Sequence, residues 1–318
     1  MKIVIPGGSG QVGTILARAL HGDGHHVVVL SRRPLTRPWR VLEWDGARLG
    51  AWRGEIDGSD VVINLAGRSV NCRYHAANRV EILQSRVLST RAVGEAIACS
   101  SRPPRVWLQA STATIYAHRY DDANDERSGV LGGDELRAPS PWRFSTDVAR
   151  EWERTFDETV TKGTRKVALR SALTLSPDAG GVFDALLGLV RHGLGGKAGD
   201  GRQFISWIHY EDFLSAVRWL IERHEIEGIV NVASPNPLPN AEFMRLLRRA
   251  YGASFGLPAR EWMLEMGAAL MRTETELILK SRRVVPGRLL EHGFTFRFPT
   301  WDKAAPDLCE QWRRASRA

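Results

Sequence analysis

The feature that most constrains the fold is a glycine-rich segment, residues 6–13, placed between an apolar run and a helical pattern. The apolar run is Ile3-Val4-Ile5, and the helical pattern begins at Thr14. A strand, a turn of glycines and a helix N-terminus together supply what a dinucleotide pyrophosphate needs, because the turn exposes backbone N–H groups to the phosphates. An ordinary glycine-rich turn is the alternative interpretation.

Three glycines of this segment have separate expected roles. Gly7 allows the tight turn out of the strand, Gly10 lets the backbone approach the phosphates, and Gly13 allows the helix to pack closely on the strand. Gln11 and Val12 lie between the last two glycines and are expected to contact the same cofactor.

The end of the second expected strand, residues 26–30, indicates which dinucleotide binds. An NAD site usually offers Asp or Glu there to the ribose 2′-hydroxyl. This chain offers Ser31, Arg32 and Arg33, a hydroxyl and two guanidiniums suited to a 2′-phosphate. We therefore expect NADP as the cofactor, with a solvated basic turn before Pro34 as the alternative.

Three more apolar runs predict parallel strands that end in candidate site residues. The run 40–44 is followed by Asp45, which either reaches the adenine edge or only forms a turn. The run 60–64 ends in small residues where phosphates and ribose would pass, namely Leu65, Ala66 and Gly67. The run 105–112 places Ala110, Ser111 and Thr112 at the carboxyl edge, where ligands bind. We expect Ala110 and Ser111 to contact the cofactor, and hydroxyls here could polarise a substrate carbonyl.

The rest of the chain continues the alternation of strands and helices that defines a doubly wound α/β sheet. A polar, turn-rich segment over 120–141 predicts a loop above the site. Helices are expected over 76–100, 142–161 and 210–223 and from Asn240 and Pro258, and strands over 166–170, 204–209 and 229–233. We expect a dinucleotide-binding Rossmann domain over 1–175, with 204–235 packing back onto it, and a smaller, mostly helical substrate-binding portion over 176–318.

Composition excludes several classes of protein. The net charge is +8, but the 44 basic residues, only six of them Lys, are dispersed and often alternate with acids, which argues against nucleic-acid binding. Three widely spaced cysteines, Cys72, Cys99 and Cys309, support neither disulfides nor a metal site. No apolar run is long enough to span a membrane. We expect a soluble, cytoplasmic protein without membrane contact, monomeric or homodimeric, that acts on a small molecule.

The chain resembles the extended short-chain dehydrogenase/reductases, the NAD(P)-dependent epimerase and dehydratase group. More narrowly, it resembles the atypical "epimerase family protein" branch, some of whose members are described as homologues of the SulA cell-division inhibitor. The shared strings are residues 7–13, 64–67, 85–90, 180–181, 201–212 and 288–300. The resemblance implies a Rossmann-type fold, NADP as cofactor, a cofactor contact for Arg86 and a family-specific region over 237–318.

The resemblance weakens at the catalytic positions. Thr112 matches the Ser or Thr of extended members, but Trp142 and Thr146 stand where they have the Tyr and Lys of Tyr-x-x-x-Lys. An indole N–H is not a useful proton donor, and Thr carries no charge. Tyr116 is the nearest phenol; it could serve as the acid, although its counterpart in the family is usually structural. His209 is expected to tie its strand to the next helix.

Two functions stay open on this basis. The first is an NADP(H)-dependent oxidoreductase or epimerase-type enzyme for a small carbonyl or hydroxyl substrate, which Thr112 would polarise. The second is a dinucleotide-binding regulatory protein, related to cell division, that keeps the cofactor but has lost the chemistry.

Overall fold

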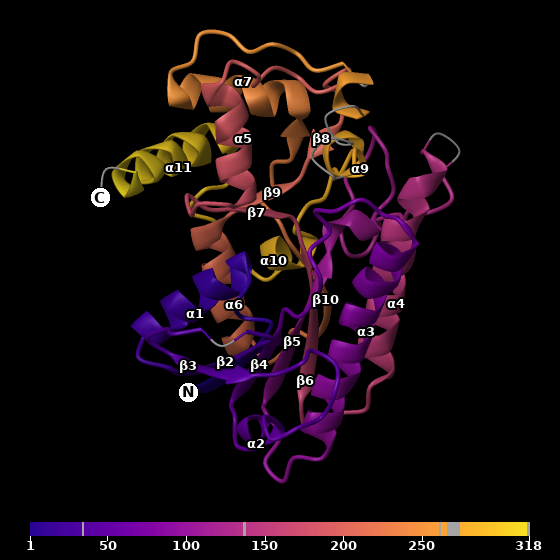
Figure 1. The fold of residues 1–318 in the computed structure, drawn as a ribbon, viewed down its shortest axis with the longest axis vertical. Helices are drawn as coiled ribbons and strands as arrows, with labels where there is room; N and C mark the ends of the chain where they lie inside the picture. The colour runs from indigo at the N-terminus through magenta and orange to yellow at the C-terminus, as the bar shows by residue number, and fades with distance from the viewer. Residues whose placement is uncertain (34, 136–137, 261, 266–273, 317–318) are drawn as a thin grey trace.

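The computed structural model describes residues 1–33, 35–135, 138–260, 262–265 and 274–316. Within them, seven strands form one parallel sheet in the order β10-β6-β5-β4-β1-β2-β3 (Figure 1). The strands are β1 (Lys2–Pro6), β2 (His26–Ser31), β3 (Arg40–Glu43), β4 (Val61–Asn64), β5 (Val106–Thr112), β6 (Arg165–Ser171) and β10 (Gly228–Val232). This is the predicted Rossmann-type sheet.

The sheet is covered on both faces, which explains why its strands are apolar along their length. Successive side chains of β1 point to opposite faces: Ile3 and Ile5 join one core cluster and Val4 joins another. The first cluster includes α1 (Gln11–Gly22) and α6 (Tyr210–Glu222). The cluster that contains Val4 includes residues of α2 (Arg53–Ile56), α3 (Ala76–Ala98) and α4 (Arg143–Glu158), which cover the other face of the sheet in Figure 1.

Besides these two clusters, a separate hydrophobic core lies above the carboxyl ends of the strands, in the upper half of Figure 1. It is called the second core below. Trp301 is at its centre, where its ring stacks on Phe243 at 4.1 Å and its Nε1 donates to the Phe243 carbonyl at 2.9 Å. Its elements are β7 (Leu173–Leu175), α5 (Val182–Arg191), β8 (Phe204–Ile205), β9 (Trp207–His209), β11 (Leu238–Pro239), α7 (Asn240–Tyr251) and α11 (Trp301–Ala315). The predicted mostly helical C-terminal portion is thus confirmed.

Short elements and irregular segments connect these two cores. They are the 3-10 helices η1 (Ala113–Ile115) and η2 (Ser140–Trp142) and the helices α9 (Glu276–Leu279) and α10 (Gly287–Glu291). The predicted loop 120–141 is irregular up to η2, although its residues 136–137 lie outside the described residues. The helix expected from Pro258 is helical over 262–265, while 261 and 266–273 also lie outside them.

The single strand predicted over 204–209 is wrong in one respect, because it is broken at Ser206. β8 pairs antiparallel with β11, whereas β9 pairs parallel with β7. At this change of partner, the Ser206 hydroxyl donates to the Arg282 carbonyl at 2.6 Å and accepts from the Val284 N–H at 2.8 Å. These two bonds hold the segment 282–284 against the break between β8 and β9.

The helix α5 is not among the helices expected from the sequence. Its buried residues Phe183, Leu187 and Val190 recur at helical spacing and pack into the second core. No helix in the described parts of the chain is both long and apolar enough to cross a lipid bilayer.

Candidate functional site

The turn after β1 is shaped by Gly7. Its φ of 75° lies in the left-handed region, and its N–H donates to the Leu30 carbonyl at 2.9 Å. A Cβ on Gly7 would come within 2.6 Å of the Ala66 backbone. The loop after β1 therefore lies directly against the loop after β4, and the tight turn predicted at Gly7 is confirmed.

The other glycines of this loop differ in what surrounds them. A Cβ on Gly13 would lie 2.5 Å from the Gly8 Cα, so Gly13 lets α1 pack closely on the turn. A Cβ on Gly10 would meet no atom nearer than the Gly7 carbonyl oxygen, 3.7 Å away. Packing among the described residues therefore explains why positions 7 and 13 are glycine, but it does not explain the glycine at position 10.

Gly10 is also the N-cap of α1. No side chain caps this helix, and its first turn holds no acidic residue. The N–H groups and dipole of this end therefore favour an anion. Val12 packs against the core, while the Gln11 Nε2 donates to the Ser176 hydroxyl at 3.4 Å. Gln11 thus ties the start of α1 to the segment between β7 and α5.

At the end of β2, Ser31 is buried and Arg32 and Arg33 are exposed. The Ser31 hydroxyl donates to the Ser9 hydroxyl at 3.0 Å and accepts from the Arg33 N–H at 3.2 Å. Within the part of the chain that the structure describes, neither guanidinium forms an ion pair or a hydrogen bond. The two positive charges are available to a ligand.

Asp45 precedes Gly46, which lies near Arg32: the nearest atom to a Cβ on Gly46 is the Arg32 Cδ, at 3.9 Å. The Asp45 Oδ1 accepts from the Ala47 and Arg48 N–H groups at 2.8 and 2.9 Å. These hydrogen bonds, the one from Arg48 above all, lower the pKa of Asp45. Oδ1 thus stabilises the turn, and contact of Asp45 with adenine stays a prediction.

The loop after β4 is held from both sides. The Asn64 Oδ1 accepts from the Ala66 N–H at 3.1 Å, and the Leu65 N–H donates to the Pro6 carbonyl at 2.8 Å. A Cβ on Gly67 would lie 3.4 Å from the Arg86 side chain. The backbone of residues 65–67 (Leu65, Ala66 and Gly67) therefore forms a narrow strip between the Gly7 turn and α3.

Arg86 is a partly buried cation beside this strip. Its Nη1 donates to the Arg68 and Ile82 carbonyls at 3.1 and 2.9 Å, and its guanidinium lies 5.0 Å from the centre of the Trp152 ring. Burial lowers the pKa of Arg86 to about 10. No carboxylate within the described residues pairs with it, so an anionic or carbonyl ligand would be stabilised here.

At the end of β5, the three expected residues have different surroundings. The Ser111 hydroxyl donates to Glu153, which also forms an ion pair with Arg170 at 2.6 Å. Ala110 is half-buried. The half-buried Thr112 accepts from the Thr114 N–H at 3.1 Å, which leaves its hydroxyl proton for another acceptor.

Tyr116 is only 1% exposed. Its hydroxyl donates to the Asn231 Oδ1 and accepts from the Arg170 Nη1, both at 2.9 Å. Burial raises the pKa of Tyr116. Of the two roles that the sequence left open for this phenol, these contacts favour the structural one.

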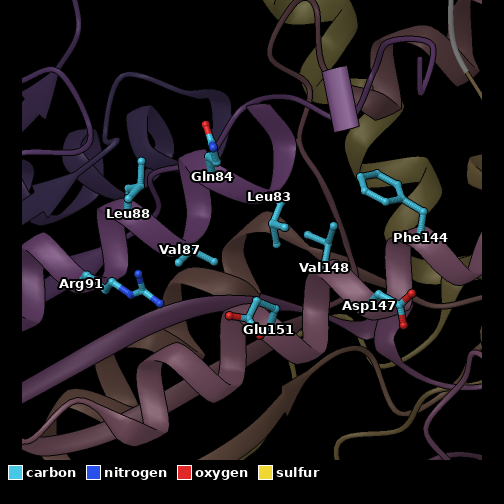
Figure 2. A pocket seen from close by; sticks show the side chains of 9 residues that line it. All are labelled: Leu83, Gln84, Val87, Leu88, Arg91, Phe144, Asp147, Val148 and Glu151. Carbon is cyan, nitrogen blue, oxygen red and sulfur yellow. The ribbon is translucent and has the colours of Figure 1, made fainter. Parts of the chain in front are cut away.

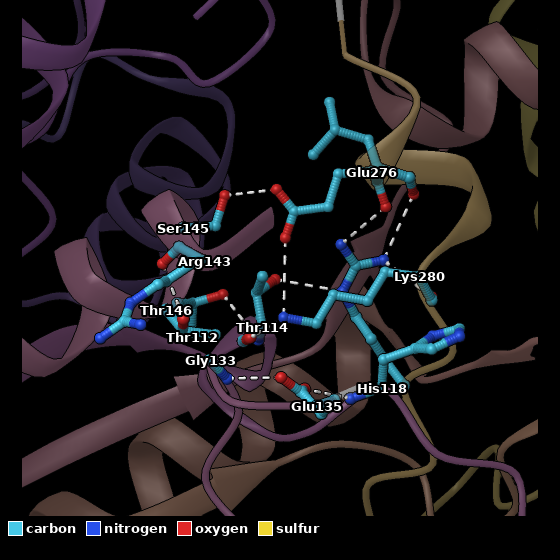
Figure 3. Close-up of polar contacts among 12 residues, drawn as sticks. Thr112, Thr114, His118, Gly133, Glu135, Arg143, Ser145, Thr146, Glu276 and Lys280 are labelled. Carbon is cyan, nitrogen blue, oxygen red and sulfur yellow. Dashed lines mark hydrogen bonds and ion pairs between the residues drawn. The ribbon is translucent and has the colours of Figure 1, made fainter. Parts of the chain in front are cut away.

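The positions that lack the usual Tyr and Lys border a cavity of about 290 Å³. Trp142 and Thr146 line it together with Lys280, which comes from the segment after α9. The Thr146 hydroxyl donates back to the Arg143 carbonyl at 2.7 Å. The Lys280 ammonium donates to the Thr114 carbonyl at 2.9 Å, as Figure 3 shows.

Lys280 and its partner Glu276 were missed in the sequence. Their spacing of four residues is ordinary for an ion pair on a helix, so nothing in it marks a site. Both side chains are only 2% exposed, and only the fold brings them beside Thr114.

A larger groove, of about 500 Å³, lies between α3 and α4. Figure 2 shows Leu83, Val87 and Val148 on its walls and Arg91 and Glu151 near its rim. None of the residues that line it is a predicted site residue.

His209 has the structural role that the sequence predicted. Its Nδ1 accepts from the Glu211 N–H at 3.2 Å and so caps α6, while its Nε2 lies 3.1 Å from Asp307.

Comparison with known proteins agrees with this geometry. Residues 3–233 match the NAD dependent epimerase/dehydratase family, and residues 261–308 match a domain of unknown function, DUF1731. The chain is 31% identical over 312 residues to the epimerase family protein SDR39U1 of Bos taurus, covering 97% of this chain and 99% of the relative. It is 30% identical over 313 residues to the epimerase family protein YfhF of Bacillus subtilis, covering 97% and 98%.

A solved structure extends the match to three dimensions. The crystal structure of human epimerase family protein SDR39U1 (isoform 2) with NADPH has a TM-score of 0.84 and 28% identity, covering 98% of this chain and 99% of that one. The fold, the strings shared along the chain and the family match agree, and the chain belongs to the NAD dependent epimerase/dehydratase family.

Proposed function

We propose that the chain binds NADPH and is an oxidoreductase that exchanges a hydride with a small carbonyl or hydroxyl substrate beside Thr112. The observation that carries the proposal is Gly10, because no contact within the described residues requires a glycine there. A phosphate lying over the uncapped end of α1 would require it. The NADPH in the crystal structure of human SDR39U1 supports the same reading.

The residues present fit such a dinucleotide along its length. The end of α1, with Gly7, Gly10, Gln11, Val12 and Gly13, would hold the pyrophosphate. Ser31, Arg32 and Arg33 would hold the 2′-phosphate, because both guanidiniums are exposed and unpaired within the described residues. The adenine, ribose and nicotinamide would follow the carboxyl edge past Asp45, Leu65, Ala66, Gly67, Arg86, Ala110 and Ser111.

The nicotinamide, when bound, supplies or accepts the hydride. Thr112 would orient the substrate, because its oxygen is fixed by the Thr114 N–H and its hydroxyl proton can be donated to a carbonyl oxygen. We assign dinucleotide binding to residues 1–175, with 204–235 packing back onto this domain, and choice of substrate to the rest of 176–318, because the second core lies above the edge where the strands end.

The alternative is a dinucleotide-binding regulatory protein without turnover. It is favoured by Trp142, which is 9% exposed, and by Thr146, whose hydroxyl is already bonded to its own helix. Neither side chain supplies the proton transfer of Tyr-x-x-x-Lys.

A single-turnover experiment separates the two functions. Protein with bound NADPH is mixed with a panel of aldehydes, ketones and nucleotide sugars, and the nicotinamide absorbance is followed. We expect a substrate-dependent loss of absorbance that Thr112→Val abolishes. Thr155→Val is the matched control, because the Thr155 hydroxyl bonds only within α4. Binding of NADPH without any oxidation across the panel would favour the regulatory function.

A further inference from the structure

We propose that Lys280 is the proton donor of this site and protonates the substrate oxygen in the cavity that Trp142 and Thr146 border. The proposal rests on the proposed oxidoreductase function and supplies an acid in place of the Tyr-x-x-x-Lys pair, which Trp142 and Thr146 replace.

Lys280 reaches the site from a segment far along the chain. Its ammonium donates to the Thr114 carbonyl at 2.9 Å, two residues beyond Thr112, and Lys280 lines the same cavity as Thr146 (Figure 3). An ammonium is thus present in the cavity although position 146, where extended members carry Lys, is Thr.

The backbone around Lys280 is fixed. The Ser281 N–H donates to the His118 Nδ1 at 2.8 Å, and the Ser281 hydroxyl donates to the Arg119 carbonyl at 2.7 Å. The carbonyl of Arg282, the residue after Ser281, accepts a hydrogen bond from the Ser206 hydroxyl. The Cα of Lys280 is therefore held in place beside the cavity, from which its side chain can reach a substrate.

Glu276 balances the charge of Lys280 without holding it tightly. Its Oε1 lies 3.6 Å from the Lys280 Nζ, beyond hydrogen-bond distance, and has no hydrogen-bond partner within the described residues. Its Oε2 accepts from the Ser145 hydroxyl. Because the ion pair is loose, the ammonium can turn toward a substrate oxygen while the carboxylate stays in place.

Burial makes Lys280 a better acid than an ordinary lysine. Burial above all, together with the nearby Arg282, lowers the pKa of Lys280 to about 8, although Glu276 and Glu135 oppose the shift. His118 also faces the ammonium, and Asp134 and Arg143 line the same cavity. A pKa near the working pH suits a group that must give up and regain a proton.

The proposed reaction balances. The carbonyl carbon gains a hydride from NADPH, and its oxygen gains the proton from the Lys280 ammonium. An alcohol, NADP⁺ and a neutral Lys280 amine result, and the amine regains its proton from water.

NMR of protein labelled with ¹³C at lysine Cε tests the proposal without a known substrate. The chain has six lysines, so Lys280→Met identifies the Lys280 signal. We expect its titration midpoint near pH 8, well below the usual value of about 10.4. NADP⁺, whose nicotinamide ring is positive, should lower this midpoint by about half a pH unit or more relative to 2′-phospho-ADP-ribose, which lacks the ring.

Lys166 is the internal control. Burial also lowers its pKa, but its ammonium binds the Asp157 and Thr159 carbonyls at the amino end of β6, so the nicotinamide should not change its midpoint. If Lys280→Met does not fold, Arg substitutions at the other five lysines assign the signal by elimination.

The possible results separate this proposal from the proposed function. A Lys280 midpoint near 10.4, or equal midpoints in the two complexes, would overturn the role of Lys280 while leaving NADPH binding intact. Failure of both nucleotides to bind in the same samples would instead overturn the proposed function, and the role of Lys280 with it.

Discussion

The Cα of Gly7 lies so close to the backbone of Ala66 that a Cβ on Gly7 would come within 2.6 Å of the Ala66 Cα. This contact joins the loops after β1 and β4, two neighbouring strands of the parallel sheet. The strip along which a dinucleotide would lie is therefore formed by backbone from both loops.

Gly7→Ala should destabilise the protein and abolish NADPH binding. The substitution places a Cβ at a φ of 75° and against the Ala66 backbone, so we expect a loss of at least about 2 kcal/mol in the free energy of unfolding. Gly24→Ala is the matched control, because Gly24 has a φ of 83° but nothing within 4 Å of its Cβ position. Urea unfolding measures both variants, and equal losses would show that the contact with Ala66 costs nothing.

Gly10→Ala should separate binding from stability. A Cβ on Gly10 meets no protein atom closer than 3.7 Å, and its φ of −72° suits alanine, so the melting temperature should hardly change. NADPH affinity should fall by about tenfold or more, because the Cβ occupies space that the pyrophosphate needs. Gly13→Ala, by contrast, should lower the melting temperature. Unchanged NADPH affinity in Gly10→Ala would remove the main support for a phosphate at this loop.

His209 should make stability depend on pH. Burial lowers the pKa of His209 to about 4 despite the nearby Asp307, whereas an unfolded His titrates near 6.5. Between these values the unfolded chain binds more protons, so the contribution of His209 to stability is lost as the pH falls from about 6.5 toward 4.

The measurement is urea unfolding at pH 7.5 and pH 5. The wild-type protein should lose up to about 2 kcal/mol more over this interval than His209→Asn does. His224→Asn, at an exposed position, should keep the wild-type pH dependence. Equal losses in the wild-type protein and His209→Asn would contradict a buried, neutral His209.

The sequence predicted those parts of the fold that depend on local pattern. Runs such as Ile3-Val4-Ile5 are apolar because both faces of the sheet are covered, and the turn at Gly7 needs a residue that accepts a positive φ. These signals lie within a few neighbouring residues. They therefore located the strands of the main sheet, the glycine loop and the candidate residues at the strand ends.

The sequence could not predict features that depend on contacts between distant segments. The break at Ser206 arises because β8 and β9 pair with different strands, β11 and β7, and no local pattern marks it. Lys280 reaches the cavity because the fold buries it beside Thr114, whereas in the sequence it forms an unremarkable pair with Glu276. The surroundings of Tyr116 likewise depend on Arg170 and Asn231, which belong to other strands.

The most direct test of the central claim is the affinity of the purified protein for NADPH and for NADH, measured by calorimetry. We predict that NADPH binds at least about tenfold more tightly, because charge-assisted bonds from Arg32 and Arg33 to the 2′-phosphate each contribute about 1.5 kcal/mol or more. The double variant Arg32→Ala with Arg33→Ala should lose this preference, while the control Arg53→Ala with Arg91→Ala, at two exposed arginines elsewhere, should keep it. Equal affinities for NADPH and NADH in the unmutated protein would contradict the account.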